Sequence, residues 1–144
     1  MGLRAGVCAA RVRCDMETRQ FQKHFTIEEA RAMLPRVRVL FRQLHGARDR
    51  VLKLDEELGR TVRMECVDLG GDKVKSLVHG IGEISMAVQS IQHLRVQVKD
   101  FDRGLVDFPT IRNGHEALFC WELKEQDIGF WHDLETGFGG REPL

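Results

Sequence analysis

Residues 105–123, with the sequence LVDFPTIRNGHEALFCWEL, decide the fold of this chain of 144 residues. Two runs within this stretch, 105–111 and 115–123, show the period-two alternation that is typical of β-strands. Between them lies Asn113-Gly114, which favours a type I′ turn because both residues tolerate positive φ. The sequence therefore predicts an antiparallel β-hairpin.

The position of the turn predicts which residues of the hairpin face one another. Counting back from the turn pairs Arg112 with His115 and places Asp107 opposite Cys120. Because strand side chains alternate between the faces of a sheet, we expect one face to be apolar and to pack on the helices described below. This face collects Val106, Phe108, Ala117, Phe119, Trp121, Leu123, Ile128 and Phe130. The other face is mixed and holds Leu105, Asp107, Leu118, Cys120, Glu122, Gly129 and Trp131.

A third strand is predicted over residues 128–132, after a short polar link at 124–127. Pairing Leu123 with Ile128 places Phe119 opposite His132, so that His132 lies on the other face from Cys120. A slip of one residue in this register would exchange the two faces.

Two long helices are predicted upstream of the sheet. Thr26 followed by Glu29 matches a capping box, and apolar residues then recur at steps of three and four over residues 27–59. Pro35 lies inside this helix and predicts a kink or break just before it, because proline lacks the backbone N–H. A second helix is expected to begin near residue 72, with an apolar stripe that reaches Val98.

These elements predict an α+β fold. A long antiparallel, coiled-coil-like helical hairpin over residues 24–99 precedes a small three-stranded antiparallel β-meander and a folded-back tail over residues 100–144. Residues 24–144 would then form a single domain, and residues 1–23 a flexible or over-called extension. A two-helix hairpin leaves apolar surface exposed, which predicts a homo-oligomer, with a dimer favoured. Alternatively, both stripes pack within one subunit.

Composition excludes several classes of protein. The 22 lysines and arginines balance 22 aspartates and glutamates, which argues against nucleic acid as a partner. No run approaches the roughly 18–20 apolar residues of a membrane span. The cysteines are Cys8, Cys14, Cys66 and Cys120, none of them in a CxxC pair. Scattered thiols without a signal peptide suit a reducing compartment, so we expect a cytoplasmic protein.

The C-terminal third carries the residues with chemical potential. Carboxylate, imidazole and thiolate groups are ligands for a divalent metal, with zinc favoured by the thiolate, and the candidate ligands are Asp107, Cys120 and His132. The predicted register opposes this site because it separates His132 from Cys120. Acid–base catalysis by Glu122, Asp107 and His132 is a second interpretation. A small-ligand site would use Asp107, Glu122, Trp131, His132 and Arg141. The glycines of residues 137–140 would let the tail bend back over the sheet, with Phe138 as an anchor and Arg141 paired with an acid such as Asp107 or Glu122.

Both ends of the predicted domain resemble a known family. Residues 24–35 read HFTIEEARAMLP, and the later segments are VKD at 98–100, GLVDFP at 104–109, CW at 120–121, WH at 131–132 and GF at 137–138. This pattern resembles an uncharacterised bacterial family, domain of unknown function 2203, over residues 24–144. The resemblance implies a small cytoplasmic bacterial protein and no particular activity.

Two functions are therefore predicted. The first is a non-enzymatic interaction module that self-associates through its helical hairpin. The alternative is a metal- or small-ligand-binding protein, or an enzyme, with its site in the acidic C-terminal sheet region. The sequence does not decide whether the protein is an enzyme.

Overall fold

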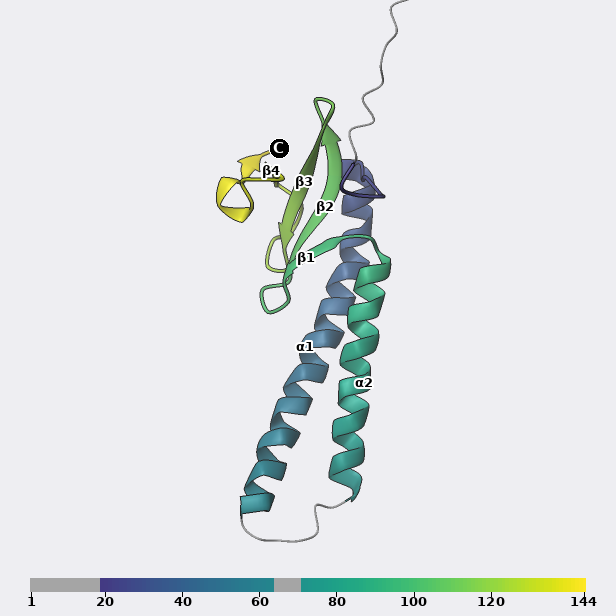
Figure 1. The fold of residues 1–144 in the computed structure, drawn as a ribbon, viewed down its shortest axis with the longest axis vertical. Helices are drawn as coiled ribbons and strands as arrows, with labels where there is room; N and C mark the ends of the chain where they lie inside the picture. The colour runs from purple at the N-terminus through teal and green to yellow at the C-terminus, as the bar shows by residue number, and fades with distance from the viewer. Residues whose placement is uncertain (1–18, 64–70) are drawn as a thin grey trace, which may run out of the picture.

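The computed structural model describes residues 19–63 and 71–144 (Figure 1). Two helices lie side by side and run in opposite directions, with a five-stranded antiparallel sheet beside them (Figure 1). The elements are α1 (Ile27–Arg63), α2 (Gly71–His93), β1 (Gln97–Asp100), β2 (Leu105–Arg112), β3 (His115–Glu122), β4 (Phe130–Asp133), the 3₁₀ turn η1 (Phe138–Gly140) and β5 (Glu142–Pro143). The sheet order is β1-β2-β3-β4-β5. The α+β class is confirmed, and the prediction of three strands is wrong.

Helix α1 begins at the predicted cap and is longer than predicted. The Glu29 backbone N–H donates to Thr26 Oγ1 at 3.2 Å, and the Thr26 N–H donates to Glu29 Oε2 at 3.0 Å. The helix continues without a break through Pro35 to Arg63, so the predicted break is absent. Leu34 and Val37 are buried on either side of Pro35. We attribute the continuity to this packing, which offsets the roughly 3 kcal/mol cost of proline in a helix.

Helix α2 ends earlier than its apolar stripe suggests. It stops at His93, and Arg95 takes a φ of 61°, which turns the chain away from the helix. Val98 therefore belongs to strand β1 and not to the helix. The turn was hidden in the sequence because the residue in the left-handed region is arginine and not glycine.

The register of the β2–β3 hairpin is confirmed, and that of the third predicted strand is wrong by one residue. Arg112 pairs with His115, and Asp107 pairs with Cys120, as predicted. Strand β4 instead places His132 opposite Leu118. His132 therefore lies on the same face as Asp107 and Cys120.

The link between β3 and β4 explains the slipped register. β3 ends at Glu122, whose N–H donates to the Glu125 carboxylate at 2.8 Å. The chain then leaves the sheet and buries Ile128 completely in the core before β4 begins at Phe130. The predicted register required Leu123 to pair with Ile128, and this pair is therefore not formed.

The core lies between the helices and one face of the sheet. Buried side chains from this face are Val106, Phe108, Phe119 and Trp121, as predicted. They pack with helix residues that include Phe41 and Ile91. Phe130 was predicted on this face, but it is 38% exposed because of the register slip. The sheet lies beside the end of the helix pair where α1 begins and α2 ends, and the other end projects beyond the sheet (Figure 1).

In the part of the chain that the structure describes, neither helix has the length and apolar character needed to cross a membrane.

Candidate metal centre

Three ligand-type side chains converge on the sheet face opposite the helices. Asp107, Cys120 and His132 come from the adjacent strands β2, β3 and β4. One ligand atom from each lies within 4.8 Å of the others. The three residues are 1%, 0% and 2% exposed, respectively, so the cluster is removed from solvent.

The orientation of His132 is set by the main chain. Its Nδ1 lies 2.7 Å from the carbonyl oxygen of Asp133. A carbonyl only accepts, so Nδ1 carries a proton and donates it. In the neutral ring, Nε2 then presents its lone pair to Asp107 Oδ2, at 3.3 Å. A proton or a cation must lie between these two atoms, because two lone pairs would otherwise face each other.

One oxygen of the cluster lacks a hydrogen-bond partner among the described residues. Asp107 Oδ1 is buried and has no hydrogen-bond partner among the described residues. Burial raises the pKa of the Cys120 thiol to about 12, and the neighbouring Asp107 carboxylate adds to this shift. A buried carboxylate oxygen without a partner is costly, whereas a metal ion would satisfy it and stabilise the thiolate.

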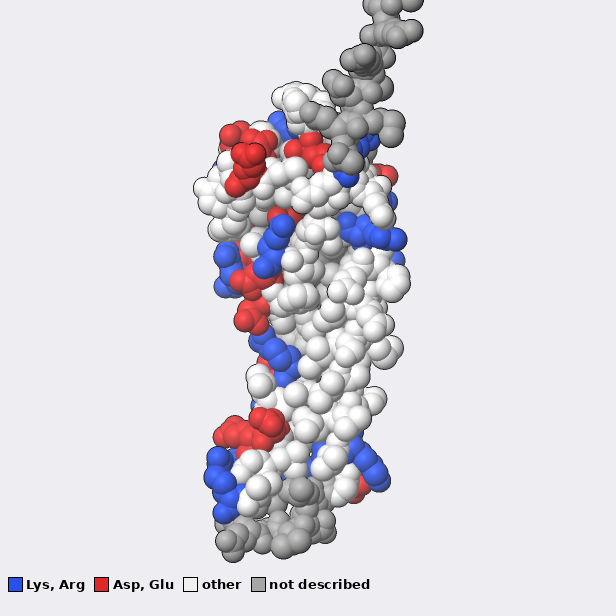
Figure 2. All heavy atoms as spheres, in the orientation of Figure 1, with Lys and Arg blue, Asp and Glu red and all other residues white. Residues whose placement is uncertain are grey.

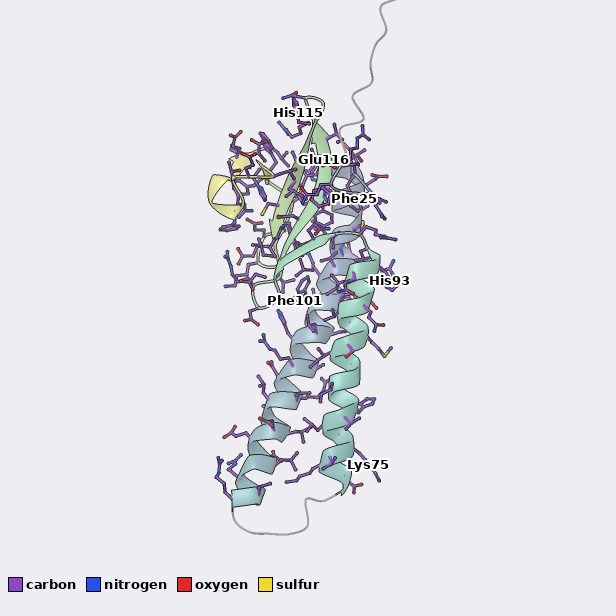
Figure 3. The ribbon with its side chains drawn as sticks, viewed as in Figure 1. Phe25, Lys75, His93, Phe101, His115 and Glu116 are labelled. Atoms are coloured by element: carbon purple, nitrogen blue, oxygen red, sulfur yellow. The ribbon has the colours of Figure 1, made fainter. Side chains whose placement is uncertain are left out.

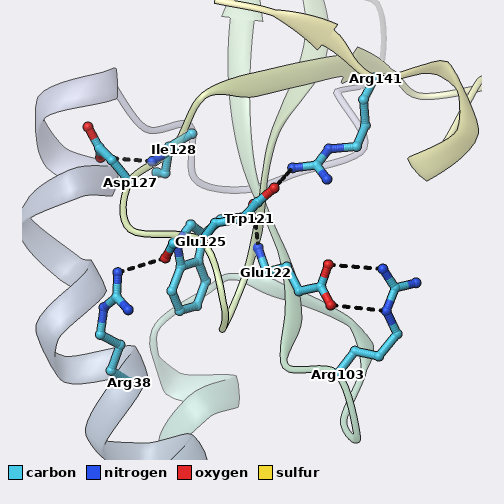
Figure 4. A network of polar contacts seen from close by, with 8 residues as sticks. All are labelled: Arg38, Arg103, Trp121, Glu122, Glu125, Asp127, Ile128 and Arg141. Carbon is cyan, nitrogen blue, oxygen red and sulfur yellow. Dashed lines mark hydrogen bonds and ion pairs between the residues drawn. The ribbon is translucent and has the colours of Figure 1, made fainter.

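A network of polar contacts surrounds the link between β3 and β4 (Figure 4). Two of its members, Glu125 and Arg141, act electrostatically on Cys120. Arg103 holds the Glu122 carboxylate with two hydrogen bonds, at 3.2 and 3.0 Å. These bonds hold the pKa of Glu122 below its ordinary value. Arg141 was predicted to pair with Asp107 or Glu122. In the structure it donates instead to Glu125, at 2.6 Å. The Phe138 ring lies 4.5 Å from the guanidinium of Arg103 and 4.7 Å from that of Arg141, and the residue is 39% exposed.

Comparison with known proteins gives a family for this chain. The family model described as "Uncharacterized conserved protein (DUF2203)" matches residues 23–144. The chain belongs to this family. The resemblance noted in the sequence is therefore confirmed. A search of curated proteins and a search of solved structures found no match to the DUF2203 chain.

The predicted small-ligand residues of this DUF2203 protein do not all meet. Asp107 and His132 are joined, and Glu122 and Arg141 lie in the neighbouring network. Trp131 precedes His132 in β4 and therefore points to the other face of the sheet, where it packs partly against the core. The guanidinium of Arg112 lies over its ring, 4.2 Å from the centroid. Glu122 is bound to Arg103 and does not belong to the buried cluster.

Glu125 was missed by sequence reasoning and connects the sheet with α1 and the tail. Its carboxylate binds Arg141 and the Glu122 N–H, and its carbonyl accepts from Trp121 Nε1 at 3.1 Å and from Arg38 at 2.9 Å. Nothing in the link at 124–127 indicated this role, because the contacts depend on the tertiary fold.

Glu116 was also missed, and it binds the segment that precedes α1 (Figure 3). Its carboxylate accepts the N–H groups of Gln20 and Phe21, at 2.8 and 3.1 Å, and lies 2.7 Å from His24 Nε2. Residues 1–18 of the predicted extension lie outside the described residues. The division of the DUF2203 chain at residue 23 stays a prediction.

Proposed function

We propose that this protein binds a divalent transition metal, with zinc favoured, through Asp107, Cys120 and His132. The observation that carries the proposal is the buried Asp107 Oδ1 atom, which has no partner among the described residues and belongs to a cluster of three ligand-type groups. A carboxylate, an imidazole and a thiolate are ligands that Zn²⁺ takes in proteins.

The spacing of the ligand atoms supports this proposal. Zinc bond lengths of about 2.0–2.3 Å place neighbouring ligand atoms roughly 3.3–3.7 Å apart in a tetrahedral site. The Asp107–His132 distance of 3.3 Å already falls in this range. Separations of up to 4.8 Å elsewhere in the cluster require a small inward movement of the side chains.

The hydrogen bond that orients the His132 ring supports the proposal as well. The hydrogen bond from His132 Nδ1 to Asp133 leaves Nε2 free to bind the metal. The bound metal would replace the proton of the Cys120 thiol. Such a site on three adjacent strands would stabilise the sheet. Three protein ligands leave one position of a tetrahedral zinc site for water or a small ligand.

Titration of the purified full-length chain with Co²⁺ tests this proposal. Cys8, Cys14 and Cys66 are first replaced by serine, so that Cys120 is the one remaining thiol. We expect one equivalent of Co²⁺, with a thiolate-to-cobalt absorption band that Zn²⁺ removes. C120A and H132A should lose the band, and H115A, at an exposed histidine, should keep it. A chain that binds no Co²⁺, or a C120A variant that binds like its parent, would disprove the metal site.

Self-association through the helices is the second candidate function. It is supported by large apolar side chains that stay exposed on helix α2, namely Val74, Val78, Ile81 and Met86. A cytoplasmic location is part of both candidates, because the buried thiol of Cys120 is free and suits a reducing compartment.

A further inference from the structure

Helix α2 packs on one side only, although most of its surface lacks charge. Over residues 76–93, Glu83 is the one acidic or basic side chain, with histidines counted as neutral. Its carboxylate is bound by Arg50 of α1 at 2.7 Å. Gly80, Ala87 and Ile91 are the buried residues of the helix. Figure 2 shows a long band without charged side chains on the side of the molecule where α2 lies. A helix without charges around most of its circumference is typical of one that is covered on more than one side.

The exposed apolar residues of α2 form a continuous row. Val74, Val78, Gly82 and Met86 follow one another at steps of four, so they lie along one ridge of the helix surface. The three large members are 40%, 63% and 70% exposed, and Ile81, in the adjacent ridge, is 49% exposed. An exposed apolar row of this length is a candidate contact with another protein.

Nothing in the described residues explains Gly82, which lies in the middle of this row. Glycine in a helix interior is unfavourable relative to alanine. Two residues earlier, Gly80 has a reason, because a Cβ there would lie 2.7 Å from Cγ2 of Val51. A Cβ on Gly82 would meet no atom of the described residues within 4 Å. If a second helix crosses α2 at Gly82, the absence of a side chain there allows the two backbones to approach closely. This would explain Gly82 as the contact with Val51 explains Gly80.

We infer that this row of α2 binds the same row of a second copy of the chain, around a two-fold axis near Gly82. Large side chains, Val78 and Met86, lie four residues to either side of the glycine, so the row is complementary to itself when one copy is reversed. Two uncharged faces meet without repulsion, whereas an acidic or basic partner would find no opposite charge on the row. The inference rests on the proposed self-association and is independent of the metal site.

Sedimentation velocity of the full-length chain over a range of concentrations tests the inference. We expect the wild type to reach twice the monomer mass of 16.5 kDa. V78E should raise the dissociation constant of the dimer at least about tenfold, by burying a charge in the interface. G82A should raise it as well, without loss of helix content by circular dichroism. V39E is the matched control, because Val39 is an exposed valine of α1 outside the row, and it should dimerise like the wild type.

The alternatives are distinguishable. A wild type that stays monomeric throughout would overturn the self-association and this surface together. A dimer that V78E and G82A leave intact would overturn only the surface. A dimer that V39E weakens as much as V78E would also overturn the surface, because the effect would then be unspecific. Circular dichroism on every variant separates loss of association from loss of folding.

Discussion

Nε2 of His132 lies 3.3 Å from Oδ2 of Asp107, although the two residues belong to strands that are not neighbours in the sheet. Strand β3 runs between them, so β2 and β4 are about 9.5 Å apart. The two side chains therefore meet over the middle strand, above Cys120, whose exposed fraction is 0%. This contact makes the cluster a buried connection between strands, with or without a metal.

Removing the Asp107 carboxylate should destabilise the protein by an amount that depends on what replaces it. D107A breaks a buried pair and should lower the free energy of unfolding by about 3 kcal/mol. D107N should cost less than about 1 kcal/mol, because the new amide can donate to the Nε2 lone pair of His132. Urea denaturation at pH 7 in the presence of a metal chelator measures both values. Equal losses for the two variants would show that the hydrogen bond to His132 contributes nothing.

Stability should decline at alkaline pH because of Cys120. Its pKa rises from an ordinary value of 9.0 to about 12 in the folded chain. The folded state therefore keeps a proton that the unfolded state loses, and the stabilisation present below pH 9 is lost as the pH rises toward 12. The slope reaches about 1.4 kcal/mol per pH unit. Urea denaturation of the metal-free chain at several pH values between 8 and 11 measures this slope.

C120A is the control for this alkaline effect. The free energy of unfolding of C120A should change less with pH than that of the wild type over the same range, because the titrating thiol is gone. Lysine and arginine contribute equally to both proteins. Parallel curves for C120A and the wild type would contradict the assigned origin of the decline.

Some parts of the fold were predictable from the sequence because they depend on neighbouring residues. The Thr26–Glu29 cap and the Asn113-Gly114 turn are local, and the turn alone determined the pairing of Asp107 with Cys120. The position of His132 was not predictable in this way. It depends on the burial of Ile128, which is a tertiary contact that draws the link out of the sheet. The short strands β1 and β5 carry too few residues for a periodic pattern to show.

The candidate site was predictable in its residue types and not in its geometry. Asp107, Cys120 and His132 were identified as ligand-type residues, but a register that was wrong by one residue separated His132 from the other two. A single slip reverses the face of every side chain in a strand. The structure therefore brings together a set that the predicted register kept apart.

Acid should weaken the attachment of the segment before α1 through Glu116. Burial would raise the pKa of this carboxyl, but the hydrogen bonds from Gln20, His24 and Phe21 outweigh it and leave the pKa below the ordinary 4.5. A lowered pKa in the folded chain means that the stabilisation is complete above pH 4.5 and is lost as the pH falls below that value.

The E116Q variant tests the contribution of this carboxylate. It should lower the free energy of unfolding by about 2 kcal/mol at pH 7, the order expected for hydrogen bonds to a charged group. It should also flatten the pH dependence below pH 4.5. E135Q, at an exposed glutamate, is the matched control and should behave like the wild type. Urea denaturation between pH 3 and 7 gives both quantities, and an E116Q curve parallel to the wild type would disprove the assignment.

Alanine should have opposite effects at two glycines of α2 that are two residues apart. G80A places a Cβ 2.7 Å from Val51 Cγ2, so the Val51 side chain or the helices must shift, and a loss of about 1–3 kcal/mol is expected. The Cβ that G82A adds meets no atom of residues 19–63 or 71–144 within 4 Å, so this variant should gain up to about 1 kcal/mol from helix propensity. Both are best measured by urea denaturation in a V78E background, which keeps any association of the chain the same in the two variants. If G82A destabilised that background, Gly82 would have a role within the single chain, and close approach of a second helix would no longer be needed to explain it.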